Sequence, residues 1–304
     1  MILRAVLVAV VALCQMRAVA AEPAPPLVDV AWLGANLCAP DLMVLDVRRS
    51  RNDYLVAHIP CAVHTNYYED GWRIRRQGIA HMIPPPAALE RLIGGLGIGN
   101  GSQVVIYASG TGPFDAAETT SIYFTFRYLG HDAVSILDGG LPAWMADWEN
   151  DFDVGAVSPE PRDFTAAPRP RMLAGRDDVL AASAGAVPLV DMRSHDMYLG
   201  INRAEVLVRP GTIPGALNLP MSWITVNDSL YFRAADQLEA LFAAAGAPAR
   251  QPMILFCNAG LESSLGWFAA HALLGNRGVR LYDGSLAEWS ADPTLPMTVK
   301  VPLP

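Results

Sequence analysis

The sequence predicts an α/β protein made of two similar halves, each a parallel β-sheet flanked by helices. Short apolar runs that are typical of buried strands alternate with longer helical segments. The same order of landmarks occurs twice along the chain. With 304 residues, 52% hydrophobic and 17% charged, the chain is long enough for two domains with sizeable cores.

The first residues predict a signal peptide over 1–21. A basic start with Arg4 is followed by a short apolar run and then by small residues around Ala20 and Ala21, where we expect cleavage. The apolar run is too short for a stable membrane span, and no later stretch is longer. We therefore expect a periplasmic or secreted protein that has no membrane contact after cleavage.

In the N-terminal domain, expected over 27–149, strands and helices alternate. A helix over 28–38 precedes a buried strand over 42–48, and a second helix over 87–96 starts after prolines and ends at Gly97. The apolar run 103–107 is the next strand, and it leads through a glycine-containing loop into a helix over 116–129 and a strand over 134–137. Residues 150–171 are rich in proline, aspartate and alanine and form the expected linker.

The C-terminal domain, expected over 172–304, repeats four landmarks of the first. The pairs, each given as the segment of the first half and then its counterpart in the second, are Asp46-Val47-Arg48 and Asp191-Met192-Arg193; Ile59-Pro60-Cys61-Ala62 and Ile213-Pro214-Gly215-Ala216; Ile106-Tyr107-Ala108 and Leu255-Phe256-Cys257; Asp138-Gly139-Gly140-Leu141 and Asp283-Gly284-Ser285-Leu286. The chain is thus an internal duplication, and alternating strands and helices predict a parallel sheet in each half.

The two halves differ at Cys257, which stands where the first half has Ala108. Cys257 follows the strand 253–256 and precedes a helix expected over 267–274. Unpaired amides at a helix start favour a thiolate. The alternative is an inert, buried free cysteine.

Composition excludes several kinds of chemistry. The chain has 30 acidic and 22 basic residues, and this acidic balance argues against a nucleic-acid partner. Lys300 is the only lysine, which argues against Schiff-base catalysis. The six histidines show no ligand spacing with cysteines or carboxylates, so no metal site is expected.

Three cysteines remain after the signal peptide: Cys38, Cys61 and Cys257. In an oxidising compartment at least one of them must stay unpaired. Either Cys38 pairs with Cys61 and leaves Cys257 free, or all three are separate.

The four paired landmarks resemble the tandem-domain rhodanese family, the thiosulfate and mercaptopyruvate sulfurtransferases, over essentially the whole mature chain. The resemblance implies that Cys257 takes a sulfane sulfur from an anionic donor, holds it as a persulfide without a cofactor, and passes it to cyanide or a thiol. It also implies that Arg193 binds the donor, with a structural ion pair as the alternative. Oligomeric state is left open.

The loop after the cysteine is the expected substrate-binding segment. Its residues are Asn258, Ala259, Gly260, Leu261, Glu262 and Ser263. We expect their amides to turn inward around the sulfur. His58, in the turn of the first half that faces the interdomain cleft in this family, is a possible auxiliary residue, with a turn histidine bonded to backbone as the alternative.

The chain departs from both branches of the family. Asn258 and Ala259 are neither the basic residues of thiosulfate-specific members nor the Gly-Ser of mercaptopyruvate-specific ones, and Met197 replaces an arginine. Glu262 adds a negative charge that should raise the pKa of Cys257 and repel small anions. Either its side chain points to solvent, or the donor is not a small dianion.

Two other functions are alternatives to sulfur transfer. Phosphatases of the same fold need an arginine at the position of Ser263, so that interpretation fails. An exported, catalytically weak sulfur-carrier or binding protein is the alternative to an enzyme; the loop composition and Met197 favour it.

Overall fold

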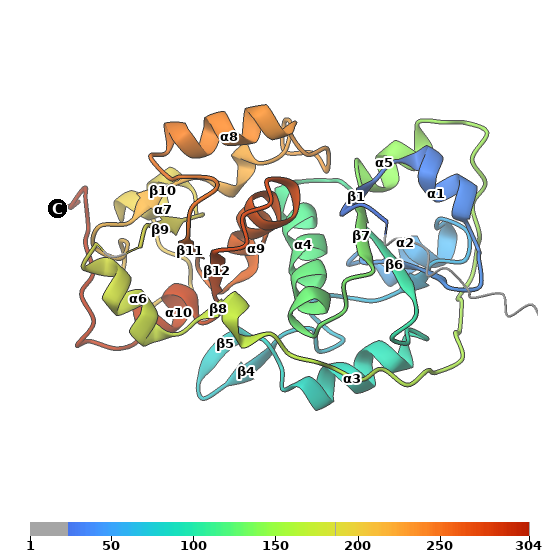
Figure 1. The fold of residues 1–304 in the computed structure, drawn as a ribbon, viewed down its shortest axis with the longest axis horizontal. Coiled ribbons are helices and arrows are strands. Elements are labelled where there is room, and N and C mark those ends of the chain that lie inside the picture. Colours follow the sequence, from blue (N-terminus) through green and yellow to red (C-terminus); the bar gives the residue numbers. More distant parts are fainter. Residues whose placement is uncertain (1–23, 186, 304) are drawn as a thin grey trace, which may run out of the picture.

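A computed structural model describes residues 24–185 and 187–303. The predicted signal peptide, 1–21, lies outside these residues. Two α/β halves lie side by side, each built on a five-stranded parallel sheet (Figure 1). The fold class predicted from the sequence is confirmed.

The first half contains the following elements, including the antiparallel hairpin β4–β5 that lies outside its sheet. They are β1 (Leu27–Val28), α1 (Val30–Asn36), β2 (Leu42–Asp46), α2 (Arg51–Val56), β3 (Val63–His64), β4 (Ile74–Arg76), β5 (Ile79–Met82), α3 (Pro86–Gly95), β6 (Gln103–Tyr107), α4 (Pro113–Tyr128), β7 (Val134–Leu137) and α5 (Gly140–Met145).

The second half repeats this order without the hairpin. Its elements are η1 (Pro170–Met172), β8 (Leu173–Ala174), α6 (Arg176–Ser183), β9 (Leu189–Asp191), α7 (His195–Leu199), β10 (Leu217–Asn218), η2 (Met221–Trp223), α8 (Ala235–Ala244), β11 (Met253–Phe256), α9 (Leu261–Phe268), the π-helical turn η3 (Ala269–Leu273), β12 (Val279–Tyr282) and α10 (Ser285–Trp289).

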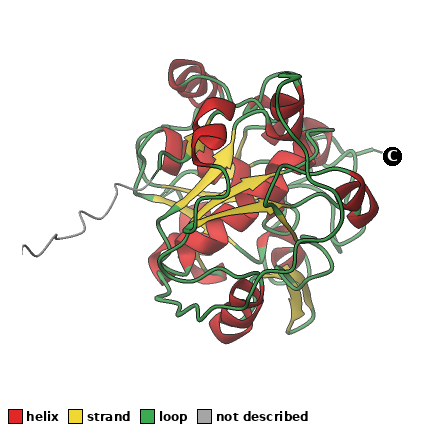
Figure 2. Ribbon diagram, turned by 90° about the vertical axis from the view of Figure 1, so that its right-hand side faces the viewer, coloured by secondary structure: helices red, strands yellow, loops and turns green. Residues whose placement is uncertain are grey.

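The two sheets have the same strand order. It is β1-β7-β6-β2-β3 in the first half and β8-β12-β11-β9-β10 in the second. The strands of the sheet that faces the viewer in Figure 2 run through the middle of that half, with helices on both sides. Because every strand pair in both sheets is parallel, all strands of a sheet end at one edge, which is where ligands bind in such folds.

The halves pack against each other through α4 and α9, which lie side by side in the centre of Figure 1. Residues 115–126 of α4 and 262–268 of α9 are buried, as expected for helices that are covered on all sides. The rings of Phe124 and Trp267 meet edge to face at 4.7 Å, and those of Tyr123 and Phe268 at 4.8 Å. These contacts join the two cores into one continuous apolar cluster.

Each half also donates a backbone amide to the other at matching positions. The amide of Ile83, just after β5, donates to Asp283 at 2.9 Å, and the amide of Phe232 donates to Asp138 at 2.9 Å. Asp138 and Asp283 are paired landmarks of the duplication. The first half therefore lies directly over the end of β12, beside the residue that follows β11.

The segment 150–169 packs along the surface of the first half. Its amides at Gly155, Arg162 and Ala167 donate to carbonyls of Leu55, Gly94 and Leu129, at 2.7–2.9 Å. Cys38 and Cys61 form a disulfide with their Cα atoms 5.6 Å apart, which decides between the two alternatives left open by the sequence. Within residues 24–185 and 187–303, no helix is long and apolar enough to cross a membrane.

Candidate active site

Cys257 is the residue that follows β11, at the edge where the parallel strands end. It is the free cysteine among the described residues, and its side chain is fully buried. The backbone around it is held by α10, because its carbonyl accepts from the amide of Leu286 at 3.1 Å and the carbonyl of Asn258 accepts from Ala287 at 2.8 Å. The thiol therefore occupies a rigid position.

The helix after Cys257 begins earlier than the sequence suggested. We expected it at 267, but α9 starts at Leu261, so the connecting loop is only Asn258, Ala259 and Gly260. Gly260 has φ of 79°, and a Cβ there would lie 3.0 Å from the carbonyl oxygen of Asp283. Only glycine fits both constraints. The helix N-terminus consequently lies next to the sulfur.

Three groups of the loop and the first turn of α9 face the sulfur. The hydroxyl of Ser263 lies 3.5 Å from Sγ of Cys257. The backbone amides of Ala259 and Ser263 also face Sγ, and these three groups lower the pKa of the thiol. Of the six residues whose amides were expected to turn inward, Ala259 and Ser263 face the sulfur, whereas the amides of Asn258 and Gly260 bind Glu262 and Ser285. The donors that face the sulfur can stabilise negative charge on it.

Ser285 organises the loop, and the sequence analysis did not single it out. Its Oγ accepts from the amides of Cys257 and Gly260, both at 3.2 Å, donates to the carbonyl of Tyr282 at 2.7 Å, and lies 3.9 Å from Sγ. Ser285 has φ of 46°, a conformation that a serine rarely adopts. The signal was available: the paired landmark of the first half has Gly140 at this position.

Glu262 points into the site, which settles the orientation left open by the sequence. The side chain is 7% exposed, and its carboxylate accepts from the backbone amide of Asn258 at 3.2 Å and from Nδ2 of Asn258 at 3.1 Å. Burial raises the pKa of Glu262 above its ordinary value. Burial also raises the pKa of the Cys257 thiol to about 12, and the negative charge of Glu262 is the second cause.

Arg193 forms the structural ion pair that the sequence left as the alternative to donor binding. Its guanidinium is fully buried, and it is bound to Asp191 at 2.6 Å and to the carbonyl of Gly211 at 2.8 Å. Arg48 makes the same contacts in the first half, with Asp46 at 2.7 Å and the carbonyl of Ala57 at 2.7 Å. Because the half without a cysteine keeps this pair, the geometry favours the structural alternative, although Nη1 of Arg193 is buried without a hydrogen-bond partner.

His58 does not face the interdomain cleft, contrary to expectation. It is fully buried, its Nδ1 lies 2.9 Å from the carbonyl of Tyr54, and its ring stacks on Tyr54 at 4.1 Å. Its backbone pairs with Asp153 of the linker segment. These partners belong to the first half and the linker, because the duplicated turn sits beneath the chain that leaves that half.

Met197, which stands where the family has a second arginine, lies beside the loop. Its Sδ is 3.7 Å from Nδ2 of Asn258, and Oδ1 of Asn258 is buried with no hydrogen-bond partner. The described residues contain no group of three or more His, Cys, Asp or Glu side chains that could hold a metal ion.

The family model described as "Rhodanese-like domain" matches residues 29–147 and again residues 176–292. The chain belongs to the rhodanese-like family. A putative thiosulfate sulfurtransferase of Haloferax volcanii is 34% identical over 278 residues, covering 86% of this chain and 92% of the relative. The 3-mercaptopyruvate sulfurtransferase of Escherichia coli is 29% identical over 277 residues, covering 88% and 95%.

Solved structures agree with this assignment. A crystal structure of the 3-mercaptopyruvate sulfotransferase SseA from Escherichia coli superposes with a TM-score of 0.75 at 27% identity, covering 86% of this chain and 99% of that one. An anaerobic ergothioneine biosynthesis enzyme from Chlorobium limicola, at 24% identity, a TM-score of 0.77, and 91% and 71% coverage, shares the fold. The predicted enzyme class, a sulfurtransferase of the tandem rhodanese type, is confirmed.

Proposed function

We propose that this sulfurtransferase works through a persulfide on Cys257, without a cofactor. The thiolate attacks the sulfane sulfur of the donor, a new S–S bond forms, and the bond from that sulfur to the rest of the donor breaks. With thiosulfate the leaving group is sulfite; with 3-mercaptopyruvate it is the pyruvate enolate, which then takes up a proton. Cyanide or a thiol attacks the outer sulfur and releases the Cys257 thiolate.

The observation that carries the proposal is the set of donors around a free thiol at the start of a helix. The amides of Ala259 and Ser263 and the hydroxyl of Ser263 face Sγ. Such donors stabilise a thiolate or a persulfide anion and need no reorganisation during the reaction. The relatives named above are sulfurtransferases, which supports the same chemistry.

The inward carboxylate of Glu262 favours a monoanionic donor over a dianion. Thiosulfate carries two negative charges, and bringing it beside a buried carboxylate is electrostatically unfavourable. A 3-mercaptopyruvate-like donor carries one charge, on a carboxylate distant from its sulfur. The donor we propose is therefore of the 3-mercaptopyruvate class, with a thiol or cyanide as acceptor.

The test combines mass spectrometry with donor kinetics. After incubation with 3-mercaptopyruvate, the peptide containing Cys257 should gain about 32 Da, one sulfur atom. In Glu262→Gln the kcat/KM for thiosulfate should rise about tenfold, while that for 3-mercaptopyruvate changes much less. Glu205→Gln, at an exposed position, is the matched control and should change neither. A wild-type preference for thiosulfate would contradict the donor assignment.

A second candidate is a catalytically weak sulfur-carrier or binding protein. The complete burial of Cys257 and its pKa of about 12 favour it, because both limit the amount of accessible thiolate. This candidate expects slow or absent turnover with both donors. Absence of the 32 Da adduct and of thiocyanate formation would support it over the enzyme.

We also propose that the protein is exported. The Cys38–Cys61 disulfide supports this, because disulfides persist in oxidising compartments. Mass spectrometry of the protein purified from its native source should find an N-terminus near residue 21 or 22 and an oxidised Cys38–Cys61 pair. An intact N-terminus with reduced cysteines would argue for a location inside the cell.

A further inference from the structure

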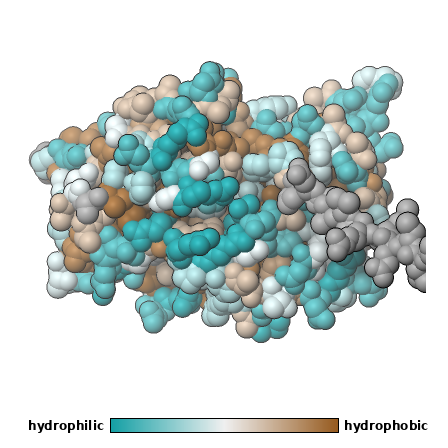
Figure 3. Space-filling model, in the orientation of Figure 1, coloured by the Kyte–Doolittle hydropathy of each residue, from teal (hydrophilic) through white to brown (hydrophobic). Residues whose placement is uncertain are grey.

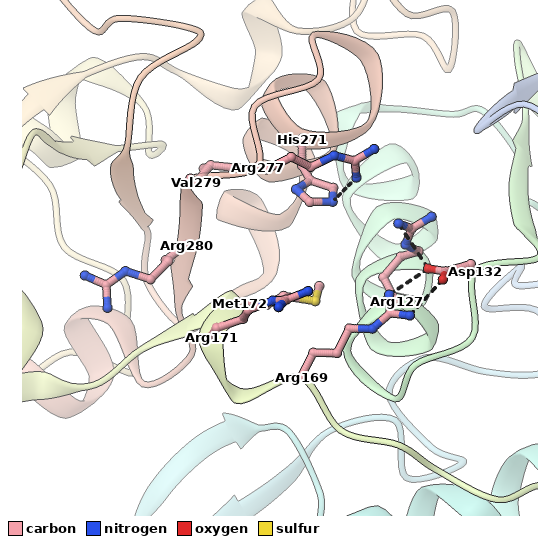
Figure 4. Close-up of a pocket in the computed structure, with 10 residues that line it drawn as sticks. Arg127, Asp132, Arg169, Arg171, Met172, His271, Arg277, Val279 and Arg280 are labelled. Carbon is pink, nitrogen blue, oxygen red and sulfur yellow. Dashed lines mark hydrogen bonds and ion pairs between the residues drawn. The ribbon is translucent and has the colours of Figure 1, made fainter.

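Arginines gather around a hollow between the two halves. The hollow has a volume of about 630 Å³ and is lined by Arg127, Arg169, Arg171, Arg277 and Arg280, with Asp132 as its one carboxylate (Figure 4). An adjoining hollow of about 260 Å³ shares Arg127, Asp132 and Arg277 with it. In the view of Figure 3, strongly hydrophilic surface collects in the middle of the molecule, where these elements meet.

This hollow is not part of the site around Cys257. Val279, in its lining, is the first residue of β12 and pairs with Met253, the first residue of β11. Cys257 follows the last residue of β11. The arginines therefore lie at the edge of the sheet where the strands begin, opposite the edge that carries the cysteine.

Part of this positive charge is already neutralised. Arg169 holds Asp132 with two hydrogen bonds of 2.6 and 2.7 Å, and Arg127 contacts the same carboxylate at 3.1 Å. Arg280 pairs with Asp178 at 3.0 Å, and in Figure 4 its guanidinium points away from the other arginines. One carboxylate inside the hollow is thus shared by two guanidinium groups.

Arg171 and Arg277 have no such partner. Neither makes an ion pair with a carboxylate of the described residues, and the one side-chain contact of Arg277 is with Nε2 of His271, at 2.9 Å. Arg171 extends from the end of the linker toward Arg127 in Figure 4. Nε of Arg127 is buried and has no hydrogen-bond partner. The hollow therefore holds unused donors on arginines from three separate segments.

His271, in the lining of the hollow, is affected by the excess positive charge of the arginines. His271 is buried and stacks on Trp267 of α9 at 4.2 Å. Its pKa is lowered to about 4, by burial first and then by the positive charges of Arg277 and Arg127. In a chain with more acidic than basic residues, such a local excess of arginine is unusual.

We propose that the arginine hollow binds a small soluble anion that carries two or more phosphate groups, bridging the two halves of the protein. Planar guanidinium groups bind phosphate oxygens through paired hydrogen bonds, and several of them converge here from α4, the linker and the turn before β12. The volume lies in the range of small-molecule sites. The site is separate from the transfer reaction and does not depend on the donor proposed above.

Pyrophosphate is the simplest probe. Isothermal titration calorimetry of the full mature protein, at an ionic strength held constant with sodium chloride, should show saturable binding to one site. Arg171→Ala/Arg277→Ala should weaken it at least tenfold. The control Arg51→Ala/Arg91→Ala removes two exposed arginines elsewhere on the surface and should bind like the wild type.

Two further measurements use the geometry of the hollow. Saturating pyrophosphate should raise the Tm of the wild type and of the control, but not that of Arg171→Ala/Arg277→Ala, because the ligand ties the two halves together. An NMR titration should show the pKa of His271 rising toward its ordinary value when the anion is bound. Absence of saturable binding, or equal binding by both double variants, would overturn the proposal.

Discussion

The two halves share what builds the sheet and differ in what surrounds the sulfur. Both keep a buried Asp-x-Arg ion pair after the second strand of the repeat and an aspartate that accepts an amide from the opposite half. At the strand end the first half has Ala108 and Gly140, whereas the second has Cys257 and Ser285. Residues that recur in both halves therefore serve the fold, and residues found in one half are candidates for chemistry.

The comparison of the two halves also bears on the role of Arg193. By resemblance to the family it was a donor-binding residue, yet Arg48 makes an equivalent pair in a half that has no cysteine. Contacts that are duplicated in the half without a cysteine favour a structural role for Arg193, and its unpartnered Nη1 is a feature that Arg48 does not share. Ser285 is the opposite case. Both Ser285 and its counterpart Gly140 have positive φ, but only Ser285 has a side chain that can bind the loop.

The largest expected effect on activity comes from replacing Cys257 with alanine, the residue that the first half has at the paired position, Ala108. Cys257→Ala should lower sulfur transfer by at least about 10³-fold, because the nucleophile is removed. The Tm should change little, because only a buried sulfur atom is lost. Activity assays with both donors and a melting curve measure this.

The reciprocal change, Ala108→Cys, is the control for that comparison. Added to Cys257→Ala, it should restore no transfer, because the first half has Gly140 in place of Ser285 and Phe114 in place of Ser263. Recovery of activity would mean that the fold alone suffices.

Breaking the shared ion pair should damage both halves to a similar extent. Asp46→Asn and Asp191→Asn each leave a buried arginine without its charge partner, at a cost of about 3–5 kcal/mol in the free energy of unfolding. Denaturant unfolding measures the loss. An Asp191→Asn protein of normal stability with a raised KM would instead support donor binding by Arg193.

Exchange of Ser285 tests the second difference between the halves. Ser285→Gly should lower kcat about tenfold, which corresponds to about 1.4 kcal/mol, because the amides of Cys257 and Gly260 lose their acceptor. Stability should be nearly unchanged, since glycine relieves the left-handed backbone. Gly140→Ser, at the paired position, should lower the Tm, because a Cβ there would lie 2.9 Å from the carbonyl oxygen of Ala108, but should leave the kcat of the folded protein unaffected.

The smallest expected effect concerns Glu262 and pH. Its pKa is raised in the folded protein, so the carboxyl lowers stability as the pH rises from the ordinary value through the raised one. Glu262→Gln should therefore be more stable than the wild type at neutral pH, by about 1 kcal/mol, and should lose this advantage at low pH. Urea unfolding at several pH values measures this.

The same substitution removes a negative charge beside the thiol. The pKa of Cys257 should fall, and the rising limb of the kcat/KM profile should move to lower pH. A profile that does not move would mean that the carboxyl is already protonated where the thiol ionises.

The lengths of the apolar runs and the polar residues that bound them predicted several of the strands, and the repeated landmarks predicted the duplication. The runs 103–107, 134–137 and 253–256 are strands within the same limits as predicted, because each is a short apolar run bounded by polar residues. The start of α9 was missed by six residues. Its first turn contains Glu262 and Ser263, whose polarity is typical of a loop until the burial between the two halves is known.

The sequence by itself determined the fold class, the two halves and the cysteine that distinguishes them, since these depend on local patterns and on a repeat. Only the tertiary structure decided the Cys38–Cys61 pairing, the inward carboxylate of Glu262, the buried ion pair of Arg193 and the arginine hollow. Each of these depends on which side chains meet across distant parts of the chain. The charge and burial of these side chains depend on tertiary packing, which a local sequence pattern does not specify.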